Sequence, residues 1–397
     1  MMRVTFTQIN DTVMRNINYN AAKLSQLQEQ LSSGRRLNRP SDNPIDMKNN
    51  INYKAELAQD GQFKRNIDDG AAWMAMTEVA MTDMNTLIQD IRERALQAAS
   101  DTMTANEREY TAQEIQQLLQ QLVSLSNSNY KGNYLFGGTN ADKPVYEYTE
   151  DTQCTFAPNT LNVNTFQSGV WNAMRTYEDN KLYQYKRLDP NSVHLTYTTT
   201  AGGIQTTAVE GVDFEVNYSE GTIRTIAGSA FETALNDPLD SETVDITFNH
   251  YNKTNRENTG SIYREIEQGV KVRINTSADE VFEDNTSNLD MIGAMTNLLD
   301  ALYKNSGARV SEAITDIDGV AKVLLAAQSR NGARINRFDL TGDRNGNREV
   351  EISRLQSELE DLDFADAIMK FSMSQNVYNA SLQAGAKVIL PTLGNYI

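Results

Sequence analysis

The chain has 397 residues, with 36 Lys and Arg, 53 Asp and Glu, and a formal net charge of −17 at pH 7. This charge argues against a nucleic-acid-binding protein, which normally carries a basic surface. A single cysteine excludes an internal disulfide framework, and no apolar run approaches the roughly 18–20 residues that a membrane helix needs. The first ten residues lack the apolar core of a secretory signal, so we expect any export to use another route.

Proline divides the chain into three parts. Four of the seven prolines lie in 141–279, whereas 45–143 and 239–390 contain none. Proline in a helix interior costs about 3 kcal/mol. The two proline-free stretches therefore predict long helices on either side of a differently built centre.

The N-terminal stretch predicts a helix with a coiled-coil seam. Two interleaved series of residues, each with a seven-residue repeat and offset by four, form this seam: Phe6, Val13, Asn20 and Leu27, and Asn10, Ile17, Leu24 and Leu31. Asparagine within a seam lowers stability but can fix register and partner. Gly34 can adopt the left-handed conformation that ends a helix, so we expect the helix to stop there, before Pro40 and Pro44.

Two further helices are predicted before the centre. The first begins at Ile45, and its clearest seam comprises Ile67, Met74, Met81, Ile88 and Ala95. Thr104 and Glu107 have the spacing of a capping box, which predicts the start of the next helix. That helix ends near Asn129, before a glycine-rich turn.

The centre, 141–279, predicts β-structure. Short runs of alternating apolar and polar residues occur at Val193–Tyr197, Phe214–Tyr218, Val244–Phe248 and Val270–Ile274. Residues 143–280 carry 11 basic and 20 acidic side chains, a net charge of −9. We interpret this insert as a solvated surface domain.

The C-terminal third predicts helices again. Val310, Ile317, Leu324 and Phe338 follow a seven-residue repeat, and the polar patch Thr341–Asn347 is interpreted as a break between helices. The last predicted helix carries these apolar residues: Ile352, Leu355, Leu359, Leu362, Met369 and Met373.

The predicted fold class is mainly α with a β-rich insert. Seams at the two distant ends most simply bury against each other, which gives an elongated rod of paired N- and C-terminal helices with an inserted β domain. The predicted domains are 1–45 with 350–397 as a terminal coiled coil, 46–140 with 280–349 as a helical rod, and 141–279 as the insert.

Catalytic and ligand motifs are not found in the sequence. His194 and His250 lack metal-ligand spacing, and Cys154 has no activating neighbour in sequence. Asp343–Asn347 resembles part of a calcium loop but has arginine where the glycine and the bidentate glutamate are required. We therefore predict no enzyme activity, cofactor or metal.

A basic cluster, Arg35, Arg36 and Arg39, lies in a locally basic region. Residues 1–66 carry 10 basic and 6 acidic side chains, a net charge of +4 in a strongly acidic protein. Two interpretations are equally supported: a solvated helix end, or an assembly surface facing acidic neighbours.

Several motifs resemble one family. The stretch from Leu31 to Ile45 reads LSSGRRLNRPSDNPI and resembles the end of the first helix in the flagellin superfamily. Its Pro-Ser-Asp-Asn-Pro form is similar to the branch of that superfamily that joins the flagellar hook to the filament. Three further segments are similar to the family: GNYLFGGT from Gly132, the stretch from Arg264 to Phe282, and VYNASL from Val377 with the tail Asn395–Ile397. The resemblance covers about 1–140 and 260–397.

The resemblance implies a structural subunit of the bacterial flagellum that is exported unfolded and whose terminal helices fold on assembly. Implied partners are further copies in a ring, hook-associated protein 1, flagellin, the flagellar type III export apparatus and an export chaperone, with no nucleic acid and no membrane insertion. Alternatives are a divergent filament flagellin, a surface adhesin or an enzyme-bearing flagellin-like protein. The predicted assembly interface is Phe6, Val13, Ile17, Leu24, Leu27, Leu31, Leu355, Leu359, Leu362, Met369 and Met373, and the predicted hinge or turn is Gly34, Pro40, Ser41, Asp42 and Pro44.

Overall fold

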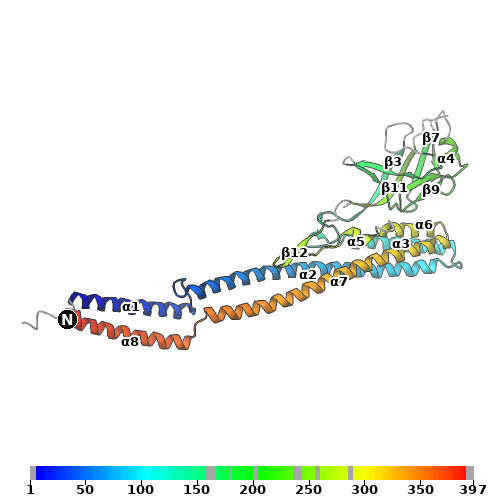
Figure 1. Ribbon diagram of the computed structural model, residues 1–397. Coiled ribbons are helices and arrows are strands. Elements are labelled where there is room, and N and C mark those ends of the chain that lie inside the picture. Colours follow the sequence, from blue (N-terminus) through cyan, green and yellow to red (C-terminus); the bar gives the residue numbers. More distant parts are fainter. Residues whose placement is uncertain are drawn as a thin grey trace, which may run out of the picture. The chain divides into compact units, whose positions relative to one another are not determined.

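The computed structural model (Figure 1) describes residues 6–156, 167, 169–178, 181–199, 204–235, 244–254, 260–284 and 289–389. The chain forms two compact units. One comprises Met1–Arg65 with Thr341–Ile397, and the other comprises Asn66–Leu340. Two long helices, α2 (Pro44–Ala98) and α7 (Gly307–Glu360), contribute residues to both units.

In the first unit, residues from the two ends of the chain run antiparallel. Helix α1 (Phe6–Ser33) lies beside α8 (Phe364–Ile389) (Figure 1). The early part of α2 lies against the late part of α7, where Lys54 Nζ is 2.9 Å from a carboxylate oxygen of Glu360. The predicted pairing of the N- and C-terminal helices is therefore confirmed within this unit.

The predicted helix break at Thr341–Asn347 is wrong. Helix α7 continues through these residues, because their polar groups pair with α2. Asn345 Nδ2 donates to the carbonyl oxygen of Asp60 at 3.0 Å, and Arg348 binds the Asp60 carboxylate with two nitrogens. The Asp60 side chain is 1% exposed, so this pairing neutralises a charge that burial would otherwise penalise.

The actual break lies at residues 361–363, inside the segment that the sequence predicted as one last helix. The Leu362 N–H donates to the carbonyl of Gly34 instead of continuing α7. Asp363 then caps α8, because its Oδ1 accepts from Ala365 N at 2.9 Å and from Asp366 N at 3.2 Å.

In the second unit, four helices share one apolar core: α2, α3 (Ala105–Ser126), α6 (Met291–Tyr303) and α7. The predicted α2 seam is buried from Ile67 to Ala95. The predicted capping box is confirmed, since Thr104 and Glu107 exchange hydrogen bonds at the start of α3. Among the described residues, no helix is long and apolar enough to cross a membrane.

Between α3 and α6 the chain forms mainly antiparallel β-structure, with a small core of its own. A four-stranded sheet has the order β3-β11-β7-β8, a three-stranded sheet has the order β4-β10-β9, and the remaining described strands form hairpins (Figure 1). The strand bounds are β1 (Asn129–Tyr130), β2 (Asn133–Tyr134), β3 (Tyr146–Phe156), β4 (Asn172–Ala173), β5 (Arg175–Glu178), β6 (Lys181–Gln184), β7 (His194–Thr199), β8 (Ile204–Ala208), β9 (Phe214–Asn217), β10 (Thr222–Thr225), β11 (Val244–Lys253), β12 (Tyr263–Glu267), β13 (Val270–Arg273), β14 (Glu283–Asp284) and β15 (Leu289–Asp290). Two short helices, α4 (Ala230–Leu235) and α5 (Ala278–Phe282), complete the elements. The four predicted strands are confirmed with end shifts of a few residues.

Buried ion pairs attach the β-structure to the helices. The Asp290 carboxylate caps α6 by accepting from Gly293 N at 2.8 Å, and it also binds Arg187 at 2.7 Å. Glu283 joins Arg187 to Lys253, which is 8% exposed. Because Arg187 and Lys253 each have carboxylate partners, their burial leaves neither charge unpaired.

We predict that Arg108→Met destabilises the second unit. The Arg108 guanidinium is buried and donates to the carbonyl oxygens of Ala98 and Ser100, both at 2.9 Å, and to Asn305. Methionine removes all of these donors and leaves the Ala98 carbonyl without this partner, which costs about 3 kcal/mol in the free energy of unfolding. Arg94→Met is the matched control, because its ion pair with Glu114 is half-exposed and worth at most about 1 kcal/mol. Denaturant unfolding measures both variants, and equal losses would contradict this role for Arg108.

Candidate functional site

The candidate site is the seam between α1 and α8. The half-buried positions of α1 include the predicted heptad series from Asn10 to Leu31. The more buried positions of α8 repeat at the same spacing: Ala367, Phe371, Ser374, Tyr378, Ser381 and Gly385. Two helices that bury one stripe each form a coiled-coil contact. The α8 stripe is rich in small residues.

A hydrogen bond and a close approach fix the register of this seam. Asn20 Nδ2 donates to Ser381 Oγ at 2.7 Å. A side chain at Gly385 would begin 3.0 Å from Ile17 Cδ1 and 3.2 Å from Val13 Cγ1, so glycine lets the helices approach there. The seam asparagine therefore has a partner on α8, as expected for a residue that sets register.

The predicted turn motif forms the joint between α1 and α2. Gly34 has φ +70° and ends α1, as predicted. The Asp42 carboxylate accepts from the backbone N–H groups of Asn38 and Arg39, at 3.1 and 2.9 Å. Asn43 Oδ1 accepts from the next helix's first N–H groups, and Pro44 takes the first helical position, where it loses no helical hydrogen bond. Pro40 and Ser41 are exposed in this turn.

The three arginines of the basic cluster close the joint through contacts within the chain. Arg35 pairs with Glu360 at 3.0 Å, and Arg39 pairs with Glu29 at 2.8 Å. The Arg36 guanidinium donates to the carbonyl of Leu359 while it pairs with the Asp46 carboxylate. Neither sequence interpretation anticipated these pairings, of which the Arg35 and Arg36 contacts tie the turn after α1 to the end of α7.

Glu360 is the central acid of this joint. Burial raises the pKa of Glu360, but hydrogen bonds from Gln356 and Lys54 and the charges of Lys54 and Arg35 outweigh burial. The net result is a pKa below the ordinary value of 4.5. The carboxylate is therefore the stabilised form in the folded joint.

The other predicted interface residues differ in exposure. Leu355, Leu359 and Leu362 are half-buried around the joint. Met369 and Met373 are 62% and 65% exposed, out of phase with the α8 stripe that faces α1. The side chain of Phe6 and the tail Asn395–Ile397 lie outside the described residues. The structure thus leaves two predicted interface methionines uncovered on α8.

Sequence reasoning missed the residues that build the joint between α7 and α8. Glu360 and Asp363 carry it, through the ion pairs and the cap described above. The signal was present, because Asp363 followed three residues later by Asp366 resembles a helix start. The continuous heptad series across 352–373 obscured this signal.

The residues considered for chemistry do not form a reactive group. The His250 ring is buried against Thr152 and Tyr185. Burial raises the pKa of the Cys154 thiol to about 11, so this thiol is almost entirely protonated at neutral pH. Within the described ranges, no three His, Cys, Asp or Glu side chains are placed to hold a metal ion.

Comparisons with known proteins point to one superfamily. The family described as the bacterial flagellin N-terminal helical region matches residues 6–141. Flagellar hook-associated protein 3 of Salmonella typhimurium strain LT2 is 26% identical over 147 residues, which cover 37% of this chain and 46% of that protein. A flagellin of Clostridium tyrobutyricum is 21% identical over 391 residues, which cover 96% of this chain and 97% of that protein. The chain is therefore similar both to flagellins and to flagellar hook-associated proteins.

The fold agrees with this similarity. A solved structure described as a flagellar hook-associated protein from Vibrio parahaemolyticus aligns with a TM-score of 0.50 and 14% identity. The alignment covers 81% of this chain and all of that one. The fold of this chain therefore resembles the fold of that protein. The chain's match to the Salmonella protein spans less than half of that protein's length.

We predict that a disulfide between Asn20→Cys and Ser381→Cys forms readily on mild oxidation. The two side chains are already in hydrogen-bond contact, and the buried Cys154 does not compete. Asn20→Cys with Ser374→Cys is the matched control, one heptad away on the same α8 stripe. Non-reducing gel electrophoresis measures the yields. Equal yields from the two pairs would mean that the register is not selected.

We predict a pH-dependent joint that depends on Glu360. A lowered folded-state pKa stabilises the joint above the ordinary value of 4.5, and this stabilisation is lost as pH falls through the folded-state pKa. Glu360→Gln should therefore speed amide exchange at Arg36 and Leu362 at neutral pH, with the ratio to wild type approaching one as pH falls below the folded-state pKa of Glu360. Glu358→Gln, on the exposed side of α7, is the control and should change exchange little. A ratio that stays constant with pH would contradict the role of Glu360.

Proposed function

We propose that the chain is a structural subunit of the bacterial flagellum that joins the hook to the filament. The observation that carries this proposal is the α1–α8 pair, which brings the two ends of the chain together and leaves apolar residues of α8 exposed. The match to a protein named flagellar hook-associated protein 3 supports the junction role. Catalysis has no part in the proposal.

The terminal helices are proposed to complete their folding on assembly. Their seam is half-buried in the single chain, and Asn10 Oδ1 is enclosed there without a hydrogen-bond partner among the described residues. A two-helix contact with such polar positions is marginal alone. Covering Met369, Met373 and Val377 with neighbouring subunits would add the missing apolar burial. This marginal stability fits a subunit that is exported unfolded and folds as it assembles.

The proposed partners follow from this role. They are further copies of the chain in a ring, hook-associated protein 1 on the hook side and flagellin on the filament side. Before assembly, the flagellar type III export apparatus and an export chaperone would handle the unfolded chain. The proposed location is the extracellular hook–filament junction.

A divergent filament flagellin is the second candidate. The nearly full-length match to the Clostridium tyrobutyricum flagellin favours it, because that alignment includes the insert. The two candidates differ in copy number. A junction protein forms one short ring per flagellum, whereas a filament flagellin is present along the whole filament.

A deletion strain tests the junction role. Cells without the gene should make hooks, lack filaments and release flagellin into the medium, and immuno-gold labelling of isolated wild-type flagella should mark one band at the hook–filament boundary. Normal filaments in the deletion strain would defeat the proposal. Labelling along the whole filament would favour the flagellin alternative.

Complementation with point variants tests the seam. Leu24→Asp places a charge in the half-buried α1 stripe, where burial without a partner costs several kcal/mol. This variant should be secreted but should fail to restore filaments. Lys23→Asp is the control on the exposed face next to it, and it should restore filaments at least in part. If both variants restored filaments equally, the result would contradict a role of the α1–α8 seam in assembly.

A further inference from the structure

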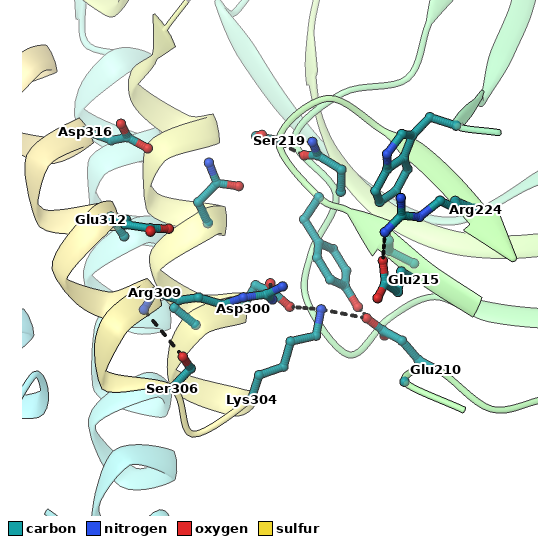
Figure 2. Close-up of a pocket in the computed structure, with 18 residues that line it drawn as sticks. Glu210, Glu215, Ser219, Arg224, Asp300, Lys304, Ser306, Arg309, Glu312 and Asp316 are labelled. Atoms are coloured by element: carbon teal, nitrogen blue, oxygen red, sulfur yellow. Dashed lines mark hydrogen bonds and ion pairs between the residues drawn. The ribbon is translucent and has the colours of Figure 1, made fainter. Parts of the chain in front are cut away.

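A cleft of about 660 Å³ lies within the second unit, and the junction role makes no use of it. One wall is the sheet β4-β10-β9, and the other consists of α6 and α7 (Figure 2). Both walls belong to the same compact unit. The cleft is large enough for a small organic ligand.

The sheet wall presents a fixed aromatic ring. Trp171 is 42% exposed at the mouth of the cleft, and the Arg224 guanidinium lies 4.7 Å from its ring centroid. Glu215 holds Arg224 from the next strand at 2.5 Å. The ring, the cation and the acid thus form a row across the sheet. The contact with Arg224 holds the Trp171 ring in one orientation. A tryptophan that only faced solvent would not need to be held in this way.

The floor of the cleft is already satisfied and therefore rigid. Lys304 lies between Glu210, at 3.0 Å, and Asp300, at 2.6 Å (Figure 2). Tyr218 donates to the other oxygen of Glu210 at 2.5 Å. These groups hold the two walls together and have little capacity left for a ligand.

The helix wall keeps hydrogen-bonding capacity. Glu312 and Asp316 lie one turn apart on α7 (Figure 2), and among the described residues neither carboxylate has an ion-pair partner. Burial raises the pKa of Asp316, a hydrogen bond from Asn297 lowers it, and the charge of Glu312 adds to the rise. Arg309 is half-exposed and reaches Asp300 only at 3.4 Å, so it retains free N–H donors.

We propose that this cleft binds a saccharide. Each sugar hydroxyl both donates and accepts, which matches a wall that offers carboxylate acceptors beside amide and guanidinium donors. The C–H face of a sugar ring packs against an aromatic plane such as Trp171. Two other classes of ligand fit less well. A phosphate or other anion would be repelled by the charges of Glu312 and Asp316, and a hydrocarbon would bury these charges without a partner. The proposal goes beyond the junction role and does not depend on it.

The test is glycan-array binding by the full-length chain, with arrays that span neutral, amino and acidic oligosaccharides. At least one glycan should be retained, and its titration should change Trp171 fluorescence in a Trp73→Phe background, where Trp171 is the sole tryptophan. Trp171→Ala and Glu312→Gln should each weaken binding about tenfold or more. Tyr263→Ala, an exposed aromatic outside the cleft, should leave binding unchanged.

Three outcomes would overturn the proposal. The first is that the chain binds no glycan on any array. The second is that Trp171→Ala and Glu312→Gln leave glycan binding unchanged. The third is that the chain binds tetralysine, used as a basic-peptide probe, but binds no glycan. The last outcome would reassign the cleft to a basic peptide. Unchanged thermal unfolding of Glu312→Gln shows that a loss of binding comes from the cleft, because Glu312 is exposed and its replacement should not disturb folding.

Discussion

The antiparallel pairing of residues from opposite ends of the sequence is the constraint on which the rest of the structure depends. Asn20 contacts Ser381 in the first unit, and Arg92 contacts Asp318 in the second. Each pairing closes a loop of hundreds of residues, and its entropic cost grows only slowly with loop length. Burial of the apolar residues along each pair of helices offsets this cost. The chain between the paired helices therefore begins and ends on helices that lie side by side.

Polar groups, more than apolar ones, set the details of this pairing. Asp60 with Asn345 and Arg348 makes a buried polar layer between α2 and α7, and Asn20 with Ser381 makes a polar step in the α1–α8 seam. Apolar stripes tolerate sliding by one heptad, whereas a buried donor needs its own acceptor. The ion pairs around Asp290 and Glu283 do the same for the β insert. The register of each helix pair is thus set by buried polar side chains, because they would lack hydrogen-bond partners in any other register.

The two units differ in how completely they bury their apolar residues. The core of Asn66–Leu340 contains many fully enclosed side chains, such as Met74, Met81 and Ile88. The α1–α8 pair is mostly half-buried along its seam and exposes methionines on α8. A fold with one well-buried core and partly exposed terminal helices is suited to a subunit whose neighbours cover those helices.

The sequence by itself determined the helices, the insert and the turn motif. Heptad spacing located the seams, proline placement located the insert, and Gly34, Asp42 and Pro44 marked the joint, because these signals act within a few residues. Only the tertiary structure decided where α7 ends and which charges meet. The break at 361–363 depends on Gly34 and Arg36, more than 300 residues away, and the cations that pair with Asp60 and Glu360 come from distant segments of the chain. Local patterns cannot specify such contacts, since the energy that selects them arises only when distant segments bury each other's polar groups.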